Sequence, residues 1–434
     1  MAEYEAYKDS GFEWLGNIPV SWPIVLLSQI VTQIKNKNSD LREQNLLSLS
    51  YGRIKRKPID TNGGLLPESF DGYNVIESND IVLRLTDLQN DHRSLRVGLA
   101  TERGIITSAY TTMRPRNSES AKYLYYLLHT FDIRKGFYGM GSGVRQGLNY
   151  DEVKKLKLPL PTIVEQEAIA AYLDRETERI DAIIAEAKAS IEEYKAWKAS
   201  IIYEVVTKGL NPNAEITDSN IEWIGKMPAH WKLIPFRYVL SERNEKNNPV
   251  VSTERLSLSI DLGVTLYADK TTNLDRLKED FTQYKIAYEG DLVMNSMNMI
   301  VGASGVSAWF GCVSPAYYTF YDAEEDHVTA KFCEYIFRNK AMLRVLHSMG
   351  KGIYSIDRGD DRVNTCRLKV PKDELKSLLI PVPPIDEQRE IVAFLNNKCN
   401  AINALIAEKE ALIADLEAYK KSLIFEVVTG KRKV

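Results

Sequence analysis

The chain has few of the residues that most often carry chemistry or cross-link a fold. It contains only four cysteines and five histidines in 434 residues, and no two cysteines form a CxxC pair. This scarcity argues against a disulfide framework and a zinc ribbon. No run approaches the roughly 18 apolar residues that a membrane helix needs, and the polar opening MAEYEAYKDS does not resemble a signal peptide. We therefore expect a protein of the reducing cytoplasm with no membrane partner.

Catalytic motifs are missing as well. The histidines are scattered without an HExxH pair, and no kinase, nucleotide-hydrolysis or nucleophile-elbow motif occurs. The glycine cluster 139–143 lacks the Gly-Lys-Ser or Gly-Lys-Thr ending of a phosphate loop. Asn211-Pro212-Asn213 is interpreted as a turn rather than a methyltransferase motif. We expect no catalytic residue and no metal ligand in this chain.

Charge is unevenly distributed although the net charge is only −3. Residues 24–157 contain 20 Lys and Arg against 14 Asp and Glu, a net +6, whereas residues 162–209 contain 6 against 10. Residues 232–378 are balanced, with 20 of each sign. The first of these segments could therefore contact nucleic acid through its charge, and the others give no such indication.

The chain repeats itself. EWLGNIPVSW at 13–22 returns as EWIGKMPAHW at 222–231, an offset of 209 that Met140-Gly141 and Met349-Gly350 share. Further along, PLPTIVEQ at 159–166 matches PVPPIDEQ at 381–388, an offset of 222. The difference of 13 residues predicts an insertion between Gly352 and Val370. Two long copies indicate a duplicated domain rather than a solenoid.

Similarity is concentrated at the ends of each copy, and residues 40–110 and 250–315 match little. Such a pattern is typical of one scaffold that presents two different recognition surfaces. Simple drift after duplication is the alternative.

Each copy ends in a long helical pattern that follows a proline. Thr162 and Glu165 have the spacing of a capping box at the start of the first pattern, which stops near Gly209. Apolar residues then recur with the alternating 4-3 spacing of a coiled-coil seam. The seam residues that we predict to join the helices and their partners are Leu173, Ile180, Ile184, Ile191, Leu395, Ile402, Ile406 and Ile413.

These patterns predict an α+β fold with two homologous globular domains of α/β type. The domains are joined by two long antiparallel coiled-coil helices with a pseudo-two-fold relation inside one chain. The expected boundaries are 1–161 for the first domain, 162–209 for the central helix, 210–383 for the second domain and 384–434 for the C-terminal helix.

The repeated segments resemble the specificity subunits of type I restriction-modification systems. The resemblance rests on the two decapeptides, on the two Pro-x-x-x-Glu-Gln helix openings, and on the helix ends KASIIYEVVTKG and KKSLIFEVVTGK. It covers essentially the whole chain in the order of the family.

This resemblance implies that each domain is a target recognition domain for one half of an asymmetric, interrupted DNA sequence. It also implies that the helices set the spacer and dock two modification subunits, with two restriction subunits completing a prokaryotic cytoplasmic enzyme. The subunit itself would be non-catalytic and bind no cofactor, because S-adenosylmethionine, ATP and magnesium belong to the partner subunits.

Contacts to double-stranded DNA are expected from the divergent stretches, since basic side chains bind phosphates while Arg, Asn and Gln read base edges. In the first domain the candidates are Arg53, Lys55 and Arg56 for phosphates, and Arg84, Arg145 and Gln146 for bases. In the second domain Asn295 and Asn298 follow a predicted strand at 291–294, and Lys351, Tyr354 and Arg358 flank or lie in the insertion. A solvated surface position is the alternative for each of them.

Two other functions remain open from the sequence. The chain could be a coiled-coil adaptor that organises partners without reading DNA, or the recognition portion of a single-chain methyltransferase. The second is disfavoured because no catalytic motif occurs.

Overall fold

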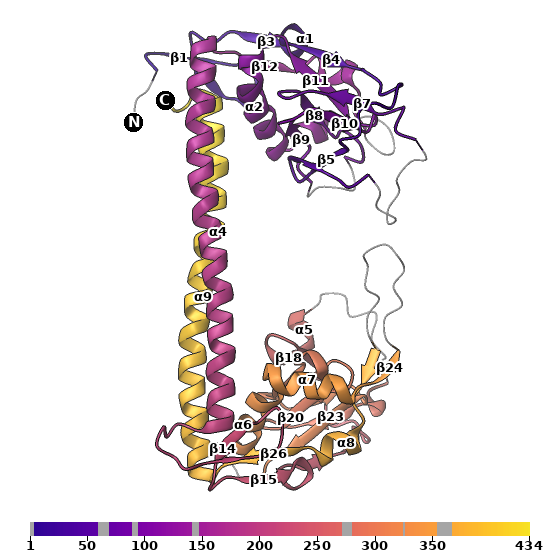
Figure 1. Ribbon diagram of the computed structural model, residues 1–434, viewed down its shortest axis with the longest axis vertical. Helices are drawn as coiled ribbons and strands as arrows, with labels where there is room; N and C mark the ends of the chain where they lie inside the picture. The colour runs from indigo at the N-terminus through magenta and orange to yellow at the C-terminus, as the bar shows by residue number, and fades with distance from the viewer. Residues whose placement is uncertain are drawn as a thin grey trace. The chain divides into compact units, whose positions relative to one another are not determined.

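The computed structural model describes residues 4–59, 69–88, 94–140, 147–270, 280–323, 326–353 and 367–434. It divides into two compact units, each built from separate parts of the chain. Unit 1 comprises Met1–Lys188 and Glu410–Val434, and unit 2 comprises Ala189–Lys409. Each unit therefore contains one globular region and parts of both long helices (Figure 1).

The central sheet has the same strand order in both units. In unit 1 it runs β4 (Val31–Ile34), β11 (Thr111–Pro115), β8 (Ile81–Leu83) and β9 (Val97–Leu99). In unit 2 it runs β16 (Ser241–Arg243), β23 (Tyr317–Tyr321), β20 (Leu292–Asn295) and β21 (Ser304–Val306). Every neighbouring pair is antiparallel. The sheets therefore agree with the α+β class.

The register of these sheets confirms the repeat. Thr112 lies opposite Val82 in unit 1, and Thr319 lies opposite Val293 in unit 2. The same residues align in sequence, because Asp80-Ile81-Val82 matches Asp291-Leu292-Val293 and Ala109-Tyr110-x-Thr112 matches Ala316-Tyr317-x-Thr319. Most of the remaining strand residues differ, but β8 is buried and apolar from Ile81 to Leu83 and β20 from Leu292 to Met294, and burial is what fixes a strand register.

Four smaller antiparallel pairs also occur in both units. In unit 1 they are β1 (Tyr7–Asp9) with β2 (Asn17–Pro19), β3 (Ile24–Leu26) with β12 (Lys157–Pro159), β5 (Leu47–Ser50) with β6 (Arg53–Arg56), and β7 (Asn74–Ile76) with β10 (Gly104–Ile106). In unit 2 they are β13 (Ile216–Asp218) with β14 (Lys226–Pro228), β15 (Lys232–Pro235) with β26 (Leu379–Val382), β17 (Leu256–Ser259) with β18 (Gly263–Leu266), and β19 (Lys285–Ala287) with β22 (Gly311–Val313).

Unit 2 has one further pair, β24 (Lys351–Ile353) with β25 (Arg367–Lys369), without a counterpart among the described strands of unit 1. It lies at the predicted 13-residue insertion between Gly352 and Val370.

Short helices complete each globular region. In unit 1 they are α1 (Leu27–Ile30), α2 (Ala121–Ile133) and α3 (Tyr150–Val153), with 3-10 turns η1 (Ser118–Ser120) and η2 (Gly136–Gly139). In unit 2 they are α5 (Tyr267–Lys270), α6 (Val328–Phe337), α7 (Lys340–Met349) and α8 (Lys372–Ser377), with η3 (Phe236–Tyr238), η4 (Phe281–Gln283) and η5 (Met299–Val301). The helices α2 and α6 supply much of the core, including Tyr123 and Leu127 in unit 1 and Phe332 and Ile336 in unit 2.

The long helices are α4 (Ile163–Lys208) and α9 (Ile385–Val428). At about 1.5 Å per residue, the 46 residues of α4 extend roughly 69 Å. The expected capping box is present, because the Glu165 amide donates to Thr162 Oγ1 at 3.3 Å while the Thr162 amide donates to Glu165 Oε2 at 3.1 Å.

The two helices are antiparallel wherever they meet. In unit 1, Lys420 of α9 donates to Asp181 Oδ1 of α4 at 2.6 Å, and in unit 2, Lys198 of α4 donates to Asn403 Oδ1 of α9 at 2.8 Å. Lower residue numbers of α4 therefore meet higher residue numbers of α9. Adding 222 to Lys198 gives Lys420, and adding 222 to Asp181 gives Asn403, so the two contacts occupy equivalent positions in the repeat with the roles of the two helices exchanged.

Most of the predicted seam is buried. Leu173, Ile180, Ile184, Ile191, Leu395 and Ile402 are buried, whereas Ile406 and Ile413 are half-buried. At their ends the helices join the globular cores: Leu173 and Val427 belong to the core of unit 1, and Val206 and Leu395 to that of unit 2. The helices are therefore part of both folds rather than linkers between them.

The second tryptophan of each decapeptide binds the start of a long helix. Trp22 Nε1 donates to Glu165 Oε1 at 3.3 Å, and Trp231 Nε1 donates to Glu387 Oε2 at 3.0 Å. The glutamine that follows each glutamate is buried and donates to a proline carbonyl, from Gln166 to Pro161 and from Gln388 to Pro383. The whole Pro-x-x-x-Glu-Gln motif thus serves to fix the helix start.

The same tryptophans also pack against the end of the other long helix. A Cβ atom on Gly430 would lie 2.3 Å from Pro19 Cδ and 3.1 Å from Trp22 Cζ3. A Cβ atom on Gly209 would lie 3.1 Å from Trp231 Cζ2. Both glycines have a φ of +72° just past the helix end, where left-handed residues commonly terminate helices. We call this arrangement of tryptophan, glutamate and glycine the helix clasp.

The close packing of the helix clasp in unit 1 can be tested at Gly430. Replacing Gly430 with Ala should destabilise the protein in two ways, by the left-handed backbone and by a clash with Pro19. Gly16→Ala is the matched control, since Gly16 has a φ of +59° but nothing within 4 Å of its added Cβ. We expect the control to cost about 1 kcal/mol, and Gly430→Ala to cost roughly 1–3 kcal/mol more. Equal urea midpoints for the two variants would contradict the close packing.

Candidate nucleic-acid interface

The hairpin β5–β6 presents three of the predicted phosphate-binding residues. Its strands alternate, so that Leu47, Leu49 and Ile54 pack in an apolar cluster against the sheet. The face opposite Ile54 carries Arg53 and Lys55. Arg53 and Lys55 pair with Ser50 and Ser48 of β5, so the side chains opposite them on this face are small and polar.

These cations differ in their partners. The mostly exposed Arg53 lies 3.4 Å from Asp181 of α4. Arg56 grips Glu102 through Nε at 2.9 and 2.8 Å and also through Nη2. Hydrogen bonding within this pair raises the pKa of Arg56 and lowers the pKa of Glu102. Lys55 is exposed and has no acidic partner among the described residues.

Arg84 directly follows β8 and is held by the buried Arg96. The Arg84 amide donates to the Arg96 carbonyl at 2.9 Å, and Arg96 Nη1 donates to the carbonyls of Arg84 and Thr86 at 3.1 and 2.8 Å. Arg96 Nη2 also donates to the Asp87 carbonyl at 3.2 Å. A fully buried arginine therefore shapes the turn that carries Arg84. Arg145 and Gln146 lie outside the described residues.

In unit 2 the corresponding turn follows β20. Asn295 has the same place as Arg84 in the strand register but is only 8% exposed. Its Oδ1 accepts hydrogen bonds from the amides of Met297 and Asn298 at 3.1 and 3.4 Å, so the side chain shapes the turn. Asn298 is exposed at the start of η5.

The remaining candidates lie near the extra hairpin of unit 2. Lys351 is exposed on β24 and forms an ion pair with Glu374 of α8. Tyr354 and Arg358 lie outside the described residues. The structure thus brings Arg53, Lys55 and Arg56 together on one hairpin and Asn295 and Asn298 into one turn, whereas Lys351 belongs to a different hairpin.

Two features of this surface are absent from the sequence-based candidates. The strands β5 and β17 share the sequence Leu-Ser-Leu-Ser at the 209 offset, which could have identified the hairpin as a repeated element. The role of Arg96 had no such signal, because its burial depends on Tyr138 and the carbonyls of a distant turn.

The exposed cations of the hairpin suit the binding of an anion. Within the described residues no group of three His, Cys, Asp or Glu side chains could hold a metal ion. None of the described helices is long and apolar enough to cross a membrane. Exposed cations on a strand hairpin, beside a polar turn, can neutralise phosphates and reach base edges in a groove.

Two units with one strand order, each with exposed turns beside its central sheet, define the class of the protein as a duplicated α+β protein. Residues 22–193 match the family model described as the type I restriction modification DNA specificity domain. Two relatives from Methanocaldococcus jannaschii align over 99% of this chain. One is provisionally named the type I restriction enzyme MjaX specificity subunit, is 22% identical and is covered over 98% of its length. The other is the type I restriction enzyme MjaVIII specificity subunit, 21% identical and covered over 97%.

Two solved structures share the fold. A chain from a study of complex assembly and conformational transition of the type I R-M system has a TM-score of 0.66 at 15% identity, with 95% of this chain and 98% of that chain covered. The HsdS subunit from Thermoanaerobacter tengcongensis has a TM-score of 0.50 at 15% identity, with 96% and 98% covered. Over its whole length the chain is thus similar to type I restriction enzyme specificity subunits, and residues 22–193 match the DNA specificity domain of type I restriction modification. This similarity supports a role in DNA recognition.

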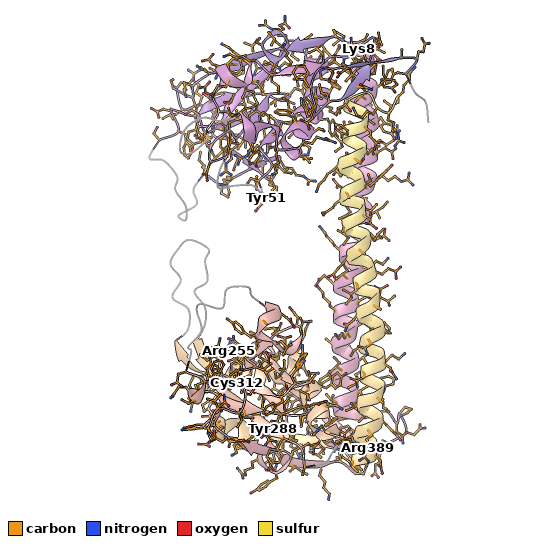
Figure 2. All side chains as sticks on the ribbon, turned by 180° about the vertical axis from the view of Figure 1, so that it is seen from behind. Lys8, Tyr51, Arg255, Tyr288, Cys312 and Arg389 are labelled. Atoms are coloured by element: carbon orange, nitrogen blue, oxygen red, sulfur yellow. The ribbon has the colours of Figure 1, made fainter. Side chains whose placement is uncertain are left out.

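Arg56 is paired with Glu102 and Lys55 has no acidic partner among the described residues, so we predict that their removal changes the salt dependence of DNA affinity by different amounts. In a complex of this chain with its modification subunits, Lys55→Ala should reduce the slope of log affinity against log salt by about 0.9. Arg56→Ala should reduce it less, because Glu102 already neutralises Arg56. Lys8→Ala is the control, since Lys8 and Tyr51 lie at opposite edges of unit 1 (Figure 2). Fluorescence anisotropy with labelled duplex DNA measures the slopes, and a slope for Lys55→Ala equal to that of Lys8→Ala would exclude Lys55 from phosphate contact.

Proposed function

We propose that this chain reads an asymmetric, bipartite DNA sequence, with unit 1 recognising one half and unit 2 the other. The observation that carries the proposal is the repeated frame: one sheet order, one register and one helix clasp, with different side chains on the exposed turns. A frame that is kept while its turns diverge allows each unit to hold a different half-sequence in an equivalent way.

We assign contacts within the halves to the candidate residues of each unit. In unit 1 Arg53, Lys55 and Arg56 bind phosphates and Arg84 reaches a base edge, together with Arg145 and Gln146. In unit 2 Asn298 reaches a base edge and Lys351 binds a phosphate, with Tyr354 and Arg358 nearby in sequence. Asn295 shapes the turn and contributes through Asn298, because its carboxamide oxygen already accepts two backbone hydrogen bonds.

The antiparallel helices set the separation of the two halves and bind two modification subunits. The equivalence of the Lys420–Asp181 and Lys198–Asn403 contacts supports two equivalent docking surfaces, one formed by the helix segments of each unit. The methylating and cleaving chemistry belongs to partner subunits that carry S-adenosylmethionine, ATP and magnesium. The chain contributes sequence recognition and no catalytic group of its own.

Exposed apolar residues mark the docking surfaces. In unit 1 Tyr419 and Ile183 are exposed, and in unit 2 Trp197 and Leu405 are exposed. A shift of 222 converts Trp197 into Tyr419 and Ile183 into Leu405. The exposed fractions of the two aromatic residues are also alike, 50% and 49%. Ile183 and Leu405 directly precede seam residues, and Trp197 and Tyr419 directly precede the lysines that bridge the two helices. The antiparallel register brings the aromatic residue of one helix level with the aliphatic residue of the other. Large exposed apolar groups that recur at equivalent places indicate two copies of one protein partner.

The first test is the methylation pattern. The chain is co-expressed with its modification subunit, and N6-methyladenine is mapped across the genome by long-read sequencing. We expect one bipartite motif, and exchange of residues 24–157 for those of another family member should change one half of it only. Exchange of residues 232–378 is the matched control and should change the other half. Absence of any bipartite motif would favour the adaptor function, and a change of both halves by one exchange would refute the assignment of one unit to one half.

The two docking surfaces predict that each chain binds two modification subunits, one at each surface. Replacing Trp197 and Leu405 with Lys should remove one of two bound modification subunits, because charged groups would have to be buried at that surface. The pair Ile183→Lys and Tyr419→Lys should remove the other. Glu192→Lys and Ala407→Lys form the control, since both residues are exposed and, at five and two residues from Trp197 and Leu405, lie on the opposite sides of their helices. Light scattering of the purified complexes gives the mass, and an unchanged mass for both apolar double variants would contradict the proposed surfaces.

A further inference from the structure

The tips of the two equivalent hairpins expose large apolar side chains. Tyr51 at the tip of β5–β6 is 74% exposed, and Leu262 at the tip of β17–β18 is 76% exposed, with Ile260 exposed beside it. Among the described residues, only Val164 and Tyr238 reach comparable values, at 76% and 71%. Figure 2 shows Tyr51 at the edge of unit 1. Apolar residues scattered singly over a surface are common, but highly exposed apolar residues at the equivalent hairpin tip of both units call for a specific explanation.

Local backbone preference does not explain the choice of Tyr51. Tyr51 and Gly52 form a two-residue turn between paired Ser50 and Arg53, with φ values of +46° and +77°. Turns with two left-handed residues strongly favour Asn, Asp or Gly at the first position, because a bulky side chain strains the backbone there. The tip therefore carries an aromatic ring at a cost in stability, which is characteristic of functional positions.

Close packing holds both tips in place. A Cβ atom on Gly98 of β9 would lie 2.5 Å from Leu49 Cδ1, and one on Gly305 of β21 would lie 2.8 Å from Gly263 Cα. These equivalent glycines let each hairpin approach the sheet closely. In unit 2, Arg338 Nη2 additionally donates to the carbonyls of Ile260 and Asp261, both at 2.8 Å. The exposed side chains thus project from a fixed support.

Cations follow the tip of unit 1 and line a cleft next to the tip of unit 2. In unit 1, Arg53 and Lys55 follow the turn on the hairpin itself. In unit 2, the tip residue Asp261 borders a cleft of about 400 Å³ that is also lined by Lys195, Lys198, Lys331 and Lys340. An apolar group beside cations is complementary to duplex DNA, whose base edges include the apolar thymine methyl group and lie between two rows of phosphates.

We propose that Tyr51 and Leu262 contact DNA bases, each in the half of the target that its own unit reads, while the neighbouring cations bind the flanking phosphates. The inference rests on the proposed function and adds residues that determine specificity to it. The contact is apolar, against a base edge such as a thymine methyl group or against the face of a base at a deformable step. It carries no charge, so it contributes to sequence preference and leaves the salt dependence of binding unchanged.

The test compares Tyr51→Ala and Leu262→Ala in complexes with the modification subunits. Binding to a duplex with the mapped motif and to a scrambled duplex is measured over a salt series. We expect about a tenfold loss of affinity for the motif, little change for the scrambled duplex and unchanged salt slopes. Methylation mapping should show relaxed preference in one half of the motif for Tyr51→Ala and in the other half for Leu262→Ala.

Two kinds of control separate this role from a structural one. Tyr238→Ala and Val164→Ala remove equally exposed apolar groups away from the tips and should leave binding unchanged. Tyr51→Asn suits the left-handed turn, so it should raise the melting temperature and still weaken binding to the motif. A purely structural role predicts that stability and binding fall together.

The possible failures are distinguishable. If the wild-type complex methylates no bipartite motif, the proposed function fails. If the motif is intact but neither tip variant loses more than twofold affinity for it, the inference about the tips fails while the function stands. Loss of a modification subunit from the tip variants would assign the tips to a protein contact and would also overturn the inference.

Discussion

The hydrogen bond from an indole N–H to a carboxylate at the start of a long helix is the interaction on which the rest of this structure depends. Trp22 and Glu165 form it in unit 1, and Trp231 and Glu387 form it in unit 2. The carboxylate lies in the first helical turn, where the helix dipole also favours negative charge. The ring faces the glycine that ends the other long helix. One side chain thus joins a helix start, a helix end and a globular core, and this explains why three separate motifs recur together in the sequence.

The helix clasp fixes the frame of each unit, so the sequences of the two units could diverge elsewhere. A change in one residue was then compensated by a different partner nearby. The buried Asp80 of unit 1 pairs with Arg114 on β11 at 2.7 and 2.8 Å. Its equivalent Asp291 pairs with Arg243 on β16 at 2.7 and 3.1 Å. A buried carboxylate needs a partner, and that partner comes from the adjacent strand in unit 1 but from one strand further along the sheet in unit 2. The turns that carry the candidate DNA contacts show the same freedom, because a buried arginine shapes one and a buried asparagine shapes the other.

The helix pair has chemically different sides. Asp181 and Asn403 meet lysines of the opposite helix, and Asp181 also meets the hairpin residue Arg53. Trp197, Leu405, Ile183 and Tyr419 are instead exposed and apolar. In unit 1 a polar position of the helix pair therefore contacts the hairpin β5–β6, whereas the apolar positions are open to solvent. This separation is compatible with the proposed division between DNA recognition and assembly.

The sequence by itself determined the duplication, the two offsets, the long helices with their capping box, and the resemblance to type I specificity subunits. Each of these depends on residue type at fixed spacing, which is local information. The tertiary structure decided which side chains are accessible to a binding partner. Arg56 is engaged by Glu102, Asn295 is buried, and Arg96 supports a turn from inside the core, whereas the tips at Tyr51 and Leu262 are open to solvent. The physical reason is that burial and ion pairing depend on residues far apart in the chain, and these are brought together only when the sheets and helices pack.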